Sequence, residues 1–315
     1  MSSKLAIIIP AYKTKYLDAA LNSIASQTNK NFKVYVCDDG SKEDIKSITE
    51  KYADQLNLQY HRFDENLGKT DLVKHWNRSV AMADEEWIWL FSDDDIMAPG
   101  CSQAFFDALE LTNSQYNLYR FNIEMIDAEG TIICVKDTHP TTETGYEFLK
   151  RRLQSKSLSA AVEYIFKREV FEKQGSFISF PVAYCSDDAS WITFAGDLPI
   201  YTIQSEKVYW RSSGINISSA GGFQIQKTDA LLKFIKYVLN SYPEKRTELL
   251  TLTEPWFYEN LSYISGRLSF VQSVKLTAQL NVIFKGSKPG AAKKIIASQL
   301  RNTRFAGKVQ KWSGY

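Results

Sequence analysis

The chain has 315 residues, with 38 basic and 36 acidic residues and a formal net charge of +2, and 44% of its residues are hydrophobic. This composition excludes a disordered chain and is sufficient for one large globular domain or two modest ones. No apolar run reaches the roughly 18 residues of a membrane span, and the N-terminal run LAIII is too short for a signal peptide, so we expect a cytoplasmic protein.

The first hundred residues alternate between strand and helix patterns. Four short apolar runs predict buried strands, at residues 5–9, 34–37, 58–63 and 87–91. Apolar residues at helical spacing predict three intervening helices, at residues 16–25, 41–54 and 72–80. Ser41 and Asp44 form a weak capping-box-like start for the second helix. Repeated units of this kind predict a parallel sheet with right-handed crossovers and helices on its faces.

The pattern is mixed between residues 100 and 220 and helical from about residue 224. The mixed part predicts helices at 105–111 and after 186–188, a strand followed by a helix at 163–175, and strands at 117–123, 131–135, 199–203 and 206–210. The helical part has predicted breaks at Tyr242-Pro243 and at residues 286–290. We find no internal repeat and no low-complexity segment.

A short group of candidate ligand residues follows each of the first four predicted strands. These residues are Pro10, Ala11 and Tyr12; Asp38, Asp39, Gly40 and Ser41; Asn66, Leu67, Gly68 and Lys69; and Asp93, Asp94 and Asp95. Ligands of open parallel sheets bind beyond the carboxyl ends of the strands, so we expect these four groups to meet at one edge. Taken singly, Asp38–Ser41 is equally well explained as a turn with a helix cap, and Asn66–Gly68 as an ordinary turn.

The acidic trio Asp93–Asp95 exceeds any capping requirement and directly follows an apolar strand, where mutual repulsion is costly. Hard divalent ions prefer carboxylate oxygens and commonly bridge one or two carboxylates to substrate phosphates. The residue types at this edge of the sheet therefore predict a site for a nucleoside diphosphate that binds together with Mg²⁺ or Mn²⁺. The four cysteines have no CxxC spacing and the three histidines are scattered, so neither zinc nor a disulfide framework is predicted.

The series IIIPAY, VCDDGS, ENLGK and LFSDDDIMAP resembles the nucleotide-sugar-dependent glycosyltransferases of family 2. The resemblance continues through YIFKREVFEKQGSF, CSDDASW and VYWRSSGINIS and covers residues 4–220. It implies an α/β fold of the GT-A type, with a Rossmann-like, mostly parallel sheet flanked by helices and a C-terminal helical extension. We expect a nucleotide-sugar-binding half at 1–99, an acceptor-binding half at 100–222 and a basic helical extension at 223–315.

The resemblance also implies roles for residues of the donor site. The expected nucleotide-sugar ligands are Pro10, Ala11, Tyr12, Asp38, Asp39, Lys69, Asp93 and Arg211. Within this set Asp93 would accept a hydrogen bond from the ribose, Arg211 would help neutralise the departing diphosphate, and Lys69 is the weaker candidate. Asp94 and Asp95 would hold Mn²⁺ or Mg²⁺ on the pyrophosphate.

Asp188 is the favoured catalytic base under this resemblance, and its neighbour Asp187 is not excluded. The family commonly has Glu-Asp at this pair, whereas this chain has Asp-Asp. Two further departures are Ser92, where the family often has an additional aspartate, and Ser213, where it often has a histidine. They leave the metal or phosphate contacts at that end of the site open.

The implied activity is an inverting, metal-dependent transfer of a hexose from a nucleoside-diphosphate sugar, with a UDP-sugar favoured, to a hydroxyl of a glycan. The setting implied is bacterial surface-polysaccharide assembly with a lipid-linked acceptor. A metal-dependent phosphatase or nucleotidyltransferase, and a non-catalytic nucleotide-sugar-binding module, remain alternatives. A dinucleotide oxidoreductase is disfavoured because no Gly-x-Gly-x-x-Gly follows the first strand, and a processive synthase because no Gln-x-x-Arg-Trp is present.

Charge is distributed unevenly along the chain. All 36 acidic residues lie at or before Glu259, whereas ten of the 38 basic residues follow it. A solvated helix face, a nucleic-acid surface and an anionic membrane surface could each use such a segment. No nucleic-acid-binding motif accompanies the charge, and apolar residues are interspersed with it, so we favour peripheral contact between residues 260–315 and the inner face of the cell membrane.

Overall fold

The computed structural model describes residues 4–214, 223–264, 268–284 and 295. The chain forms two compact units. Unit 1 comprises Met1–Arg152, Lys156–Ser179 and Ser186–Ser213, and unit 2 comprises Leu153–Ser155, Phe180–Cys185 and Gly214–Tyr315. The division into three segments that the sequence predicts, at residues 99/100 and 222/223, stays a prediction.

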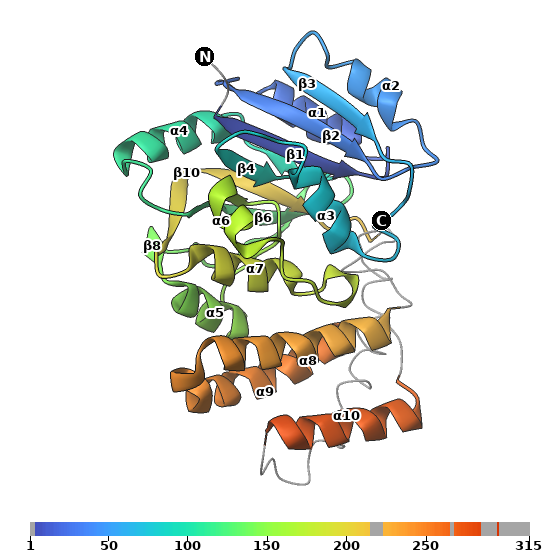
Figure 1. The fold of residues 1–315 in the computed structure, drawn as a ribbon, viewed down its shortest axis with the longest axis vertical. Helices are drawn as coiled ribbons and strands as arrows, with labels where there is room; N and C mark the ends of the chain where they lie inside the picture. Colours follow the sequence, from blue (N-terminus) through green and yellow to red (C-terminus); the bar gives the residue numbers. More distant parts are fainter. Residues whose placement is uncertain (1–3, 215–222, 265–267, 285–294, 296–315) are drawn as a thin grey trace. The chain divides into compact units, whose positions relative to one another are not determined.

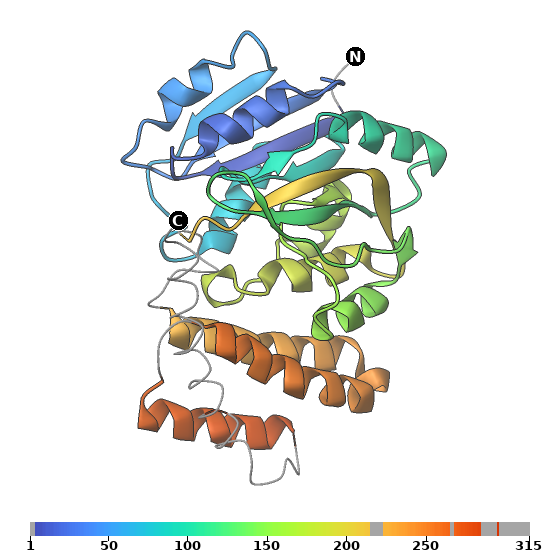
Figure 2. The same cartoon turned by 180° about the vertical axis from the view of Figure 1, so that it is seen from behind.

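Unit 1 is built on a ten-stranded sheet with strand order β3-β2-β1-β4-β9-β6-β10-β5, to which β7 and β8 add at β6 and β10 (Figures 1 and 2). The strands are β1 Leu5–Ala11, β2 Phe32–Asp38, β3 Leu58–Arg62, β4 Trp87–Leu90, β5 Ile96–Met97, β6 Leu118–Ile126, β7 Ile132–Cys134, β8 Thr142–Glu143, β9 Tyr164–Lys167 and β10 Ile200–Arg211. The helices of this unit are α1 Leu17–Ala25, α2 Ile45–Glu50, α3 Leu72–Val80, α4 Cys101–Leu111, α5 Gly145–Leu153, α6 Arg168–Gln174 and α7 Ser186–Ala195.

The first four strands confirm the predicted parallel half of the sheet. β1 lies between β2 and β4 and is parallel to both, with Ile7 opposite Val34 and Ile8 opposite Leu90. β9 is antiparallel to β4 and to β6, whereas β6 and β10 are again parallel to each other. The carboxyl ends of β1, β2, β3 and β4 consequently lie at one edge of the sheet, and this edge positions the candidate site.

Aromatic side chains fill the core between the sheet and α4. Trp87 packs edge-on against Phe105 and Tyr119, and Trp89 stacks on Phe121 with ring centroids 5.3 Å apart. All five side chains are at least 98% buried. Full burial of one such side chain stabilises the fold by about 1.5–3 kcal/mol, so this cluster is a major part of the core.

Three predicted elements differ from the structure. The strands expected at 199–203 and 206–210 form the single strand β10, whose pairing with β6 shifts between Ile203 and Lys207, so the polar residues between them form a bulge and do not end the strand. The second helix begins at Ile45 after the N-cap Asp44, because the Ser41 hydroxyl donates to the Tyr12 carbonyl oxygen at 2.6 Å. The short elements β5, β8 and α5 were not predicted.

Unit 2 contains helices α8 Gln224–Ser241, α9 Arg246–Tyr263 and α10 Phe270–Ile283, with short 3-10 turns η1 Pro181–Ala183 and η2 Pro243–Lys245. The break predicted at Tyr242-Pro243 is confirmed, because η2 separates α8 from α9 there, whereas the break predicted at 286–290 lies outside the described residues. α8 and α9 lie side by side (Figures 1 and 2), with Phe234 of α8 against Trp256 of α9. Within the described part of the chain, no helix has the length and hydrophobicity needed to cross a membrane.

Candidate active site

The Asp93 carboxylate connects the carboxyl ends of β1 and β4. Its Oδ2 accepts hydrogen bonds from the main-chain N–H groups of Tyr12 at 2.9 Å and Lys13 at 3.1 Å. The Tyr12 side chain itself is 42% exposed, whereas Ala11 is fully buried and its carbonyl accepts from the Asp39 N–H at 2.9 Å. Tyr12 and Asp93, both predicted donor ligands, therefore lie together, and Pro10 and Ala11 supply the strand end beneath them.

Arg211 holds the other two aspartates of the trio. Its main-chain N–H donates to Asp95 Oδ1 at 2.7 Å, and its Nε donates to the Asp94 carbonyl oxygen at 2.8 Å. Its Nη1 donates to the carbonyl oxygens of Asp127 and Ala128, and the whole residue is only 3% exposed. Arg211 thus joins the end of β10 to the acidic loop after β4, and its guanidinium also lies over the ring of Tyr16, 4.6 Å from the ring centroid.

Burial and mutual repulsion disfavour the ionised forms of the trio, although Lys13 and Arg211 partly oppose this effect. Burial and the negative charge of Asp94 raise the pKa of Asp93 to about 6 and that of Asp95 well above its usual range. Burial also raises the pKa of Asp94, partly opposed by the hydrogen bond from Ser92, whose Oγ lies 2.6 Å from Asp94 Oδ1. A nearby cation would stabilise the ionised forms of all three carboxylates.

These residues fit a divalent ion that is shared with a substrate. Oxygen ligands from Asp94 and Asp95 suit Mg²⁺ or Mn²⁺. No group of three His, Cys, Asp or Glu side chains in the described ranges converges as a complete metal cage.

Asp38 is the last residue of β2 and lies at the carboxyl edge of the sheet. The residue is fully buried, and its carboxylate accepts from Tyr60 Oη, from Arg62 Nη1 and from the Ser41 N–H, each at 2.7 Å. The Arg62 side chain, which pairs with Asp38, is 50% exposed to solvent. The sequence predicted Asp38 but not Tyr60 or Arg62, both of which lie in the third strand at alternate positions.

Asp39 joins the end of β2 to the turn after β3. Its two oxygens accept from the N–H groups of Leu67 at 3.0 Å and Gly68 at 2.7 Å, and Arg78 of α3 also donates to it. A Cβ on residue 68 would lie 2.6 Å from Asp39 Oδ2, so the close approach requires glycine. Arg78 was not predicted, because no motif marks it, and Lys69 contributes only an N–H to Asn66 in the described contacts.

Asp187 and Asp188, the two predicted candidates for the catalytic base, lie in the first turn of α7. Asp188 is 4% exposed, and its carboxylate forms a two-pronged pair with Arg152, with Nε–Oδ1 and Nη2–Oδ2 distances of 2.9 Å each. Asp187 is partly exposed, and burial together with the charge of Asp188 raises its pKa to about 7. Neither Arg152 nor the buried Glu163, whose carboxylate accepts from the Ala160 N–H, was predicted.

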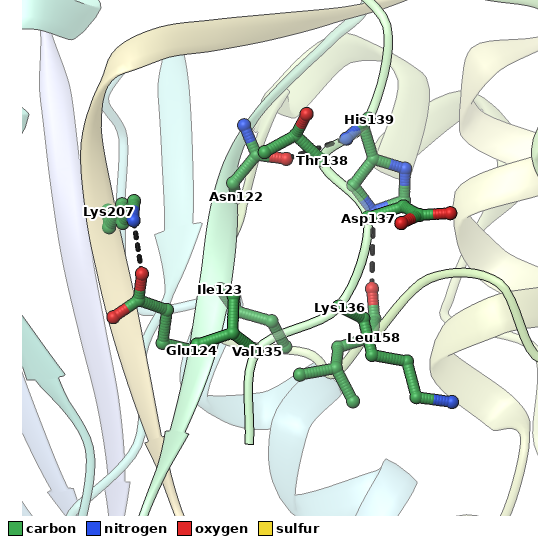
Figure 3. A pocket seen from close by; sticks show the side chains of 10 residues that line it. All are labelled: Asn122, Ile123, Glu124, Val135, Lys136, Asp137, Thr138, His139, Leu158 and Lys207. Atoms are coloured by element: carbon green, nitrogen blue, oxygen red, sulfur yellow. Dashed lines mark hydrogen bonds and ion pairs between the residues drawn. The ribbon is translucent and has the colours of Figure 1, made fainter. Parts of the chain in front are cut away.

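A separate polar cavity opens between β6 and residues 135–139 (Figure 3). His139 lies at its upper end, where its N–H donates to Asn122 Oδ1 at 2.7 Å, and Lys207 is paired with Glu124 at the other side. The cavity volume of about 20 Å³ is far below the roughly 300 Å³ at which ligand pockets begin. It is therefore no candidate for the substrate site.

Comparison with known proteins places the chain among related sequences. The family model described as Glycosyl transferase family 2 matches residues 6–172. Among curated relatives, the poly(ribitol-phosphate) beta-N-acetylglucosaminyltransferase TarS of Staphylococcus aureus is 34% identical over 95 residues, which are 29% of this chain and 16% of TarS. The chondroitin synthase of Pasteurella multocida is 31% identical over 147 residues, 40% of this chain and 15% of that protein. The chain spans between 15% and 20% of the length of the first curated relatives it matches.

Solved structures with the same fold extend over nearly the whole chain. S. aureus TarS 1–349 in complex with UDP-GlcNAc superposes with a TM-score of 0.68 and 18% identity over 97% of this chain and 92% of that chain. The mannosyltransferase PcManGT of Pyrobaculum calidifontis, in complex with GDP-Man and Mn²⁺, gives a TM-score of 0.56 and 16% identity over 95% and 87%. At these identities the likeness concerns the fold alone, and it confirms the predicted GT-A type architecture.

Proposed function

The chain belongs to glycosyl transferase family 2, and we propose on that basis that it transfers a sugar from a nucleoside-diphosphate sugar to a glycan hydroxyl with inversion. The observation that carries the proposal is the connection of Asp93 to the end of β1 and of Asp95 to the end of β10. These contacts hold three carboxylates at the carboxyl edge of a GT-A type sheet, where a diphosphate would bind. A UDP-sugar is the favoured donor, supported by the UDP-GlcNAc that the TarS structure contains.

Residues at the carboxyl ends of the parallel strands would form the donor site. Tyr12 would stack on or border the nucleobase, Asp39 and Arg78 would face the base and ribose, and Asp93 would accept from the ribose. Asp94 and Asp95 would hold Mn²⁺ or Mg²⁺, which when bound acts as a Lewis acid on the departing diphosphate. Arg211 acts on the donor through the loop, because it fixes both of those aspartates.

The acceptor hydroxyl would lose its proton to the Asp187–Asp188 pair. A carboxylate within hydrogen-bond reach of the hydroxyl is what a single displacement requires as general base. The acceptor oxygen attacks the anomeric carbon from the face opposite the diphosphate, so the configuration inverts. Asp188 remains the favoured base, and Asp187 remains the second candidate because it is the more exposed of the two.

The acceptor is proposed to be a lipid-linked glycan at the cytoplasmic face of a membrane. The name of TarS describes transfer of a sugar to poly(ribitol-phosphate), and that of chondroitin synthase describes the synthesis of a polysaccharide, which supports a glycan or polymer acceptor. Helix α10 adds support for membrane contact. One side of this helix packs through Leu276, Leu280 and Ile283, whereas the apolar residues Phe270, Val271, Val274 and Val282 are 52–83% exposed.

An anionic bilayer is the proposed occupant of this exposed face. α10 has no acidic residue, and none follows Glu259 in the sequence, where ten basic residues occur. A second copy of the chain would bring two such basic segments together, which is electrostatically unfavourable, whereas anionic lipid would accept both the charge and the apolar side chains. Of the ten basic residues that follow Glu259, only Lys275 lies in the part of the chain that the structure describes.

Product analysis tests the proposal. The chain is incubated with Mn²⁺ and UDP-, GDP-, CDP- or dTDP-sugars, and release of nucleoside diphosphate is measured with and without glycan acceptors. Release of nucleoside diphosphate that Asp188→Asn reduces supports the proposal, and the parallel Asp187→Asn variant separates the two base candidates. Release of inorganic phosphate or pyrophosphate would instead support a phosphatase or nucleotidyltransferase. Donor binding without any turnover would support a non-catalytic module.

A further inference from the structure

We propose that Arg152 is a positioning residue that fixes Asp188 and keeps the Asp187–Asp188 pair in its charged, proton-accepting form. The inference rests on the proposed function, because it concerns the residues that would accept the acceptor's proton. Two parallel N–H···O bonds of 2.9 Å connect the Arg152 guanidinium to the two oxygens of Asp188. Such a two-pronged pair fixes the carboxylate plane as well as its charge.

The guanidinium is itself held in place. Arg152 lies in the last turn of α5, which runs beside α7 in both views (Figures 1 and 2). Its Nη1 donates to the Ser157 carbonyl oxygen at 3.1 Å, so hydrogen bonds to Ser157 and to Asp188 orient the guanidinium. The Arg152 side chain is 23% exposed and that of Asp188 is 5% exposed. Water therefore screens the pair only weakly, and the interaction is stronger than an exposed ion pair.

Arg152 is the cation that balances a buried acidic cluster. Burial and the charge of Asp188 raise the pKa of Asp187 to about 7, and the positive charge of Arg152 opposes that rise. Glu163 also faces the pair, and burial raises its pKa to about 8, so it is mainly neutral at pH 7. Tyr164, beside Glu163, has its pKa raised by burial and is neutral as well. The guanidinium of Arg152 is thus the positive charge that faces this group of acidic side chains.

The charge state of the pair matters for the chemistry. In the transfer step the O–H proton of the acceptor moves to a carboxylate oxygen of the pair. The electron pair of that O–H bond forms the new bond to the anomeric carbon, and the bond between this carbon and the diphosphate oxygen breaks with its electrons on the diphosphate. Without Arg152 the two adjacent carboxylates would hold a shared proton up to higher pH, as like charges in close contact do, so a smaller fraction of the pair would be free to accept the acceptor's proton at neutral pH.

Two variants separate charge from geometry. In Arg152→Gln we expect kcat to fall by about 100-fold, the acid limb of the kcat profile to move to higher pH by about one unit, and the donor KM to change less than about twofold. Arg152→Lys retains the charge, so its acid limb should stay near that of the wild type, although kcat falls because the fork is lost. Arg151→Gln is the matched control: Arg151 precedes Arg152 in α5, has the same 23% exposure, and contacts Glu143 and Thr138 instead of the pair.

The outcomes distinguish this inference from the function on which it rests. An active wild type whose Arg152→Gln variant keeps the original acid limb, with activity reduced only as in Arg151→Gln, overturns the inference and leaves the function intact. A wild type that turns over no donor overturns the function. In that event urea unfolding still tests the role of Arg152. If Arg152 balances the charge of the ionised pair, the loss of stability in Arg152→Gln relative to the wild type should be larger at pH 8 than at pH 5. A loss equal at both pH values would show that Arg152 has a packing role alone.

Discussion

The main-chain N–H of Arg211 donates to Asp95 Oδ1 over 2.7 Å and thereby joins the last strand of unit 1 to the acidic loop after β4. The guanidinium of Arg211 reinforces this connection through the carbonyl oxygens of Asp94, Asp127 and Ala128. The arrangement of the proposed metal ligands therefore depends on a residue more than a hundred positions later in the chain. Arg211 stabilises the shape of the loop, and its direct contact with the departing diphosphate stays a prediction.

Arg211→Ala should loosen the acidic loop and destabilise the fold. The substitution leaves three partly buried carbonyl oxygens without their donor, and we expect a loss of about 2–4 kcal/mol in the free energy of unfolding. Affinity for UDP with Mn²⁺ should fall more than affinity for UDP alone. Urea unfolding and calorimetric titration check both effects. Undiminished metal-dependent affinity in a destabilised variant would show that the loop does not need Arg211.

Asp95→Asn should remove a metal ligand and preserve the loop. The asparagine side-chain oxygen can still accept from the Arg211 N–H, so the stability of the ligand-free chain should change by less than about 1 kcal/mol. Turnover should fall on the order of 1,000-fold, and the thermal stabilisation by UDP should lose its dependence on Mn²⁺. Ser92→Ala, which removes only one hydrogen bond to Asp94, is the control and should have a small effect. Stabilisation by UDP that still requires Mn²⁺ in Asp95→Asn would contradict the assignment.

Gly68→Ala should disturb the Asp39 carboxylate. The added Cβ would lie 2.6 Å from Asp39 Oδ2, so either the side chain or the turn must move, at a cost of about 1–3 kcal/mol in stability. Because Asp39 is expected beside the nucleobase, the affinity for UDP should also fall. Lys69→Ala, one position later, has an exposed side chain and should leave stability unchanged. Undiminished UDP affinity in a destabilised Gly68→Ala variant would show that the donor does not depend on the position of Asp39.

The sequence predicts the parallel half of unit 1 well because its strands are continuous apolar runs with short connections. Each run ends in polar residues, and the rule that ligands bind at carboxyl ends then brings Asp38, Asp39, Asp93 and Tyr12 to one edge. The bulge in β10 was misread as a strand break, because the polar residues between Ile203 and Lys207 interrupt the apolar pattern while the backbone continues. Periodicity alone does not distinguish a bulge from a turn.

The partners of the site residues could not be predicted in the same way. Arg152, Arg78 and Arg62 are ordinary basic residues in helices or a strand, and nothing in their spacing sets them apart from the other basic residues of the sequence. Their importance comes from tertiary contacts with Asp188, Asp39 and Asp38. A single sequence identifies acidic residues placed where a cation is needed, but it does not identify which distant cation meets them.

Phe270→Asp combined with Val274→Asp should weaken binding to anionic vesicles. Both residues lie on the exposed face of α10, and placing two negative charges there opposes both apolar insertion and attraction to phosphatidylglycerol. We expect the affinity for such vesicles to fall on the order of tenfold or more, measured by vesicle sedimentation at low salt, with donor hydrolysis unchanged. Leu111→Asp, at a site 76% exposed on α4, is the control. Equal binding to uncharged phosphatidylcholine vesicles, or a wild-type dimer that only the double variant disrupts, would contradict the membrane assignment.

Glu163→Gln should make the ligand-free chain more stable at alkaline pH. Burial raises the pKa of Glu163 to about 8 from its ordinary value of 4.5, so the folded state binds a proton that the unfolded state has released between these two values. Stability from this group is therefore fully present below about pH 4.5 and is lost as the pH rises towards 8. Asp187, with a pKa raised to about 7, acts in the same direction.

Glutamine has no proton to lose, and its carbonyl oxygen can still accept from the Ala160 N–H. We accordingly expect Glu163→Gln and the wild type to differ little in urea unfolding at pH 5, whereas the variant should be the more stable at pH 8. Glu169→Gln, an exposed position at the start of α6, should run parallel to the wild type at both pH values. If the advantage of Glu163→Gln were the same at pH 5 and pH 8, Glu163 would be ionised throughout that range, and the charge balance proposed around Arg152 would need a second cation.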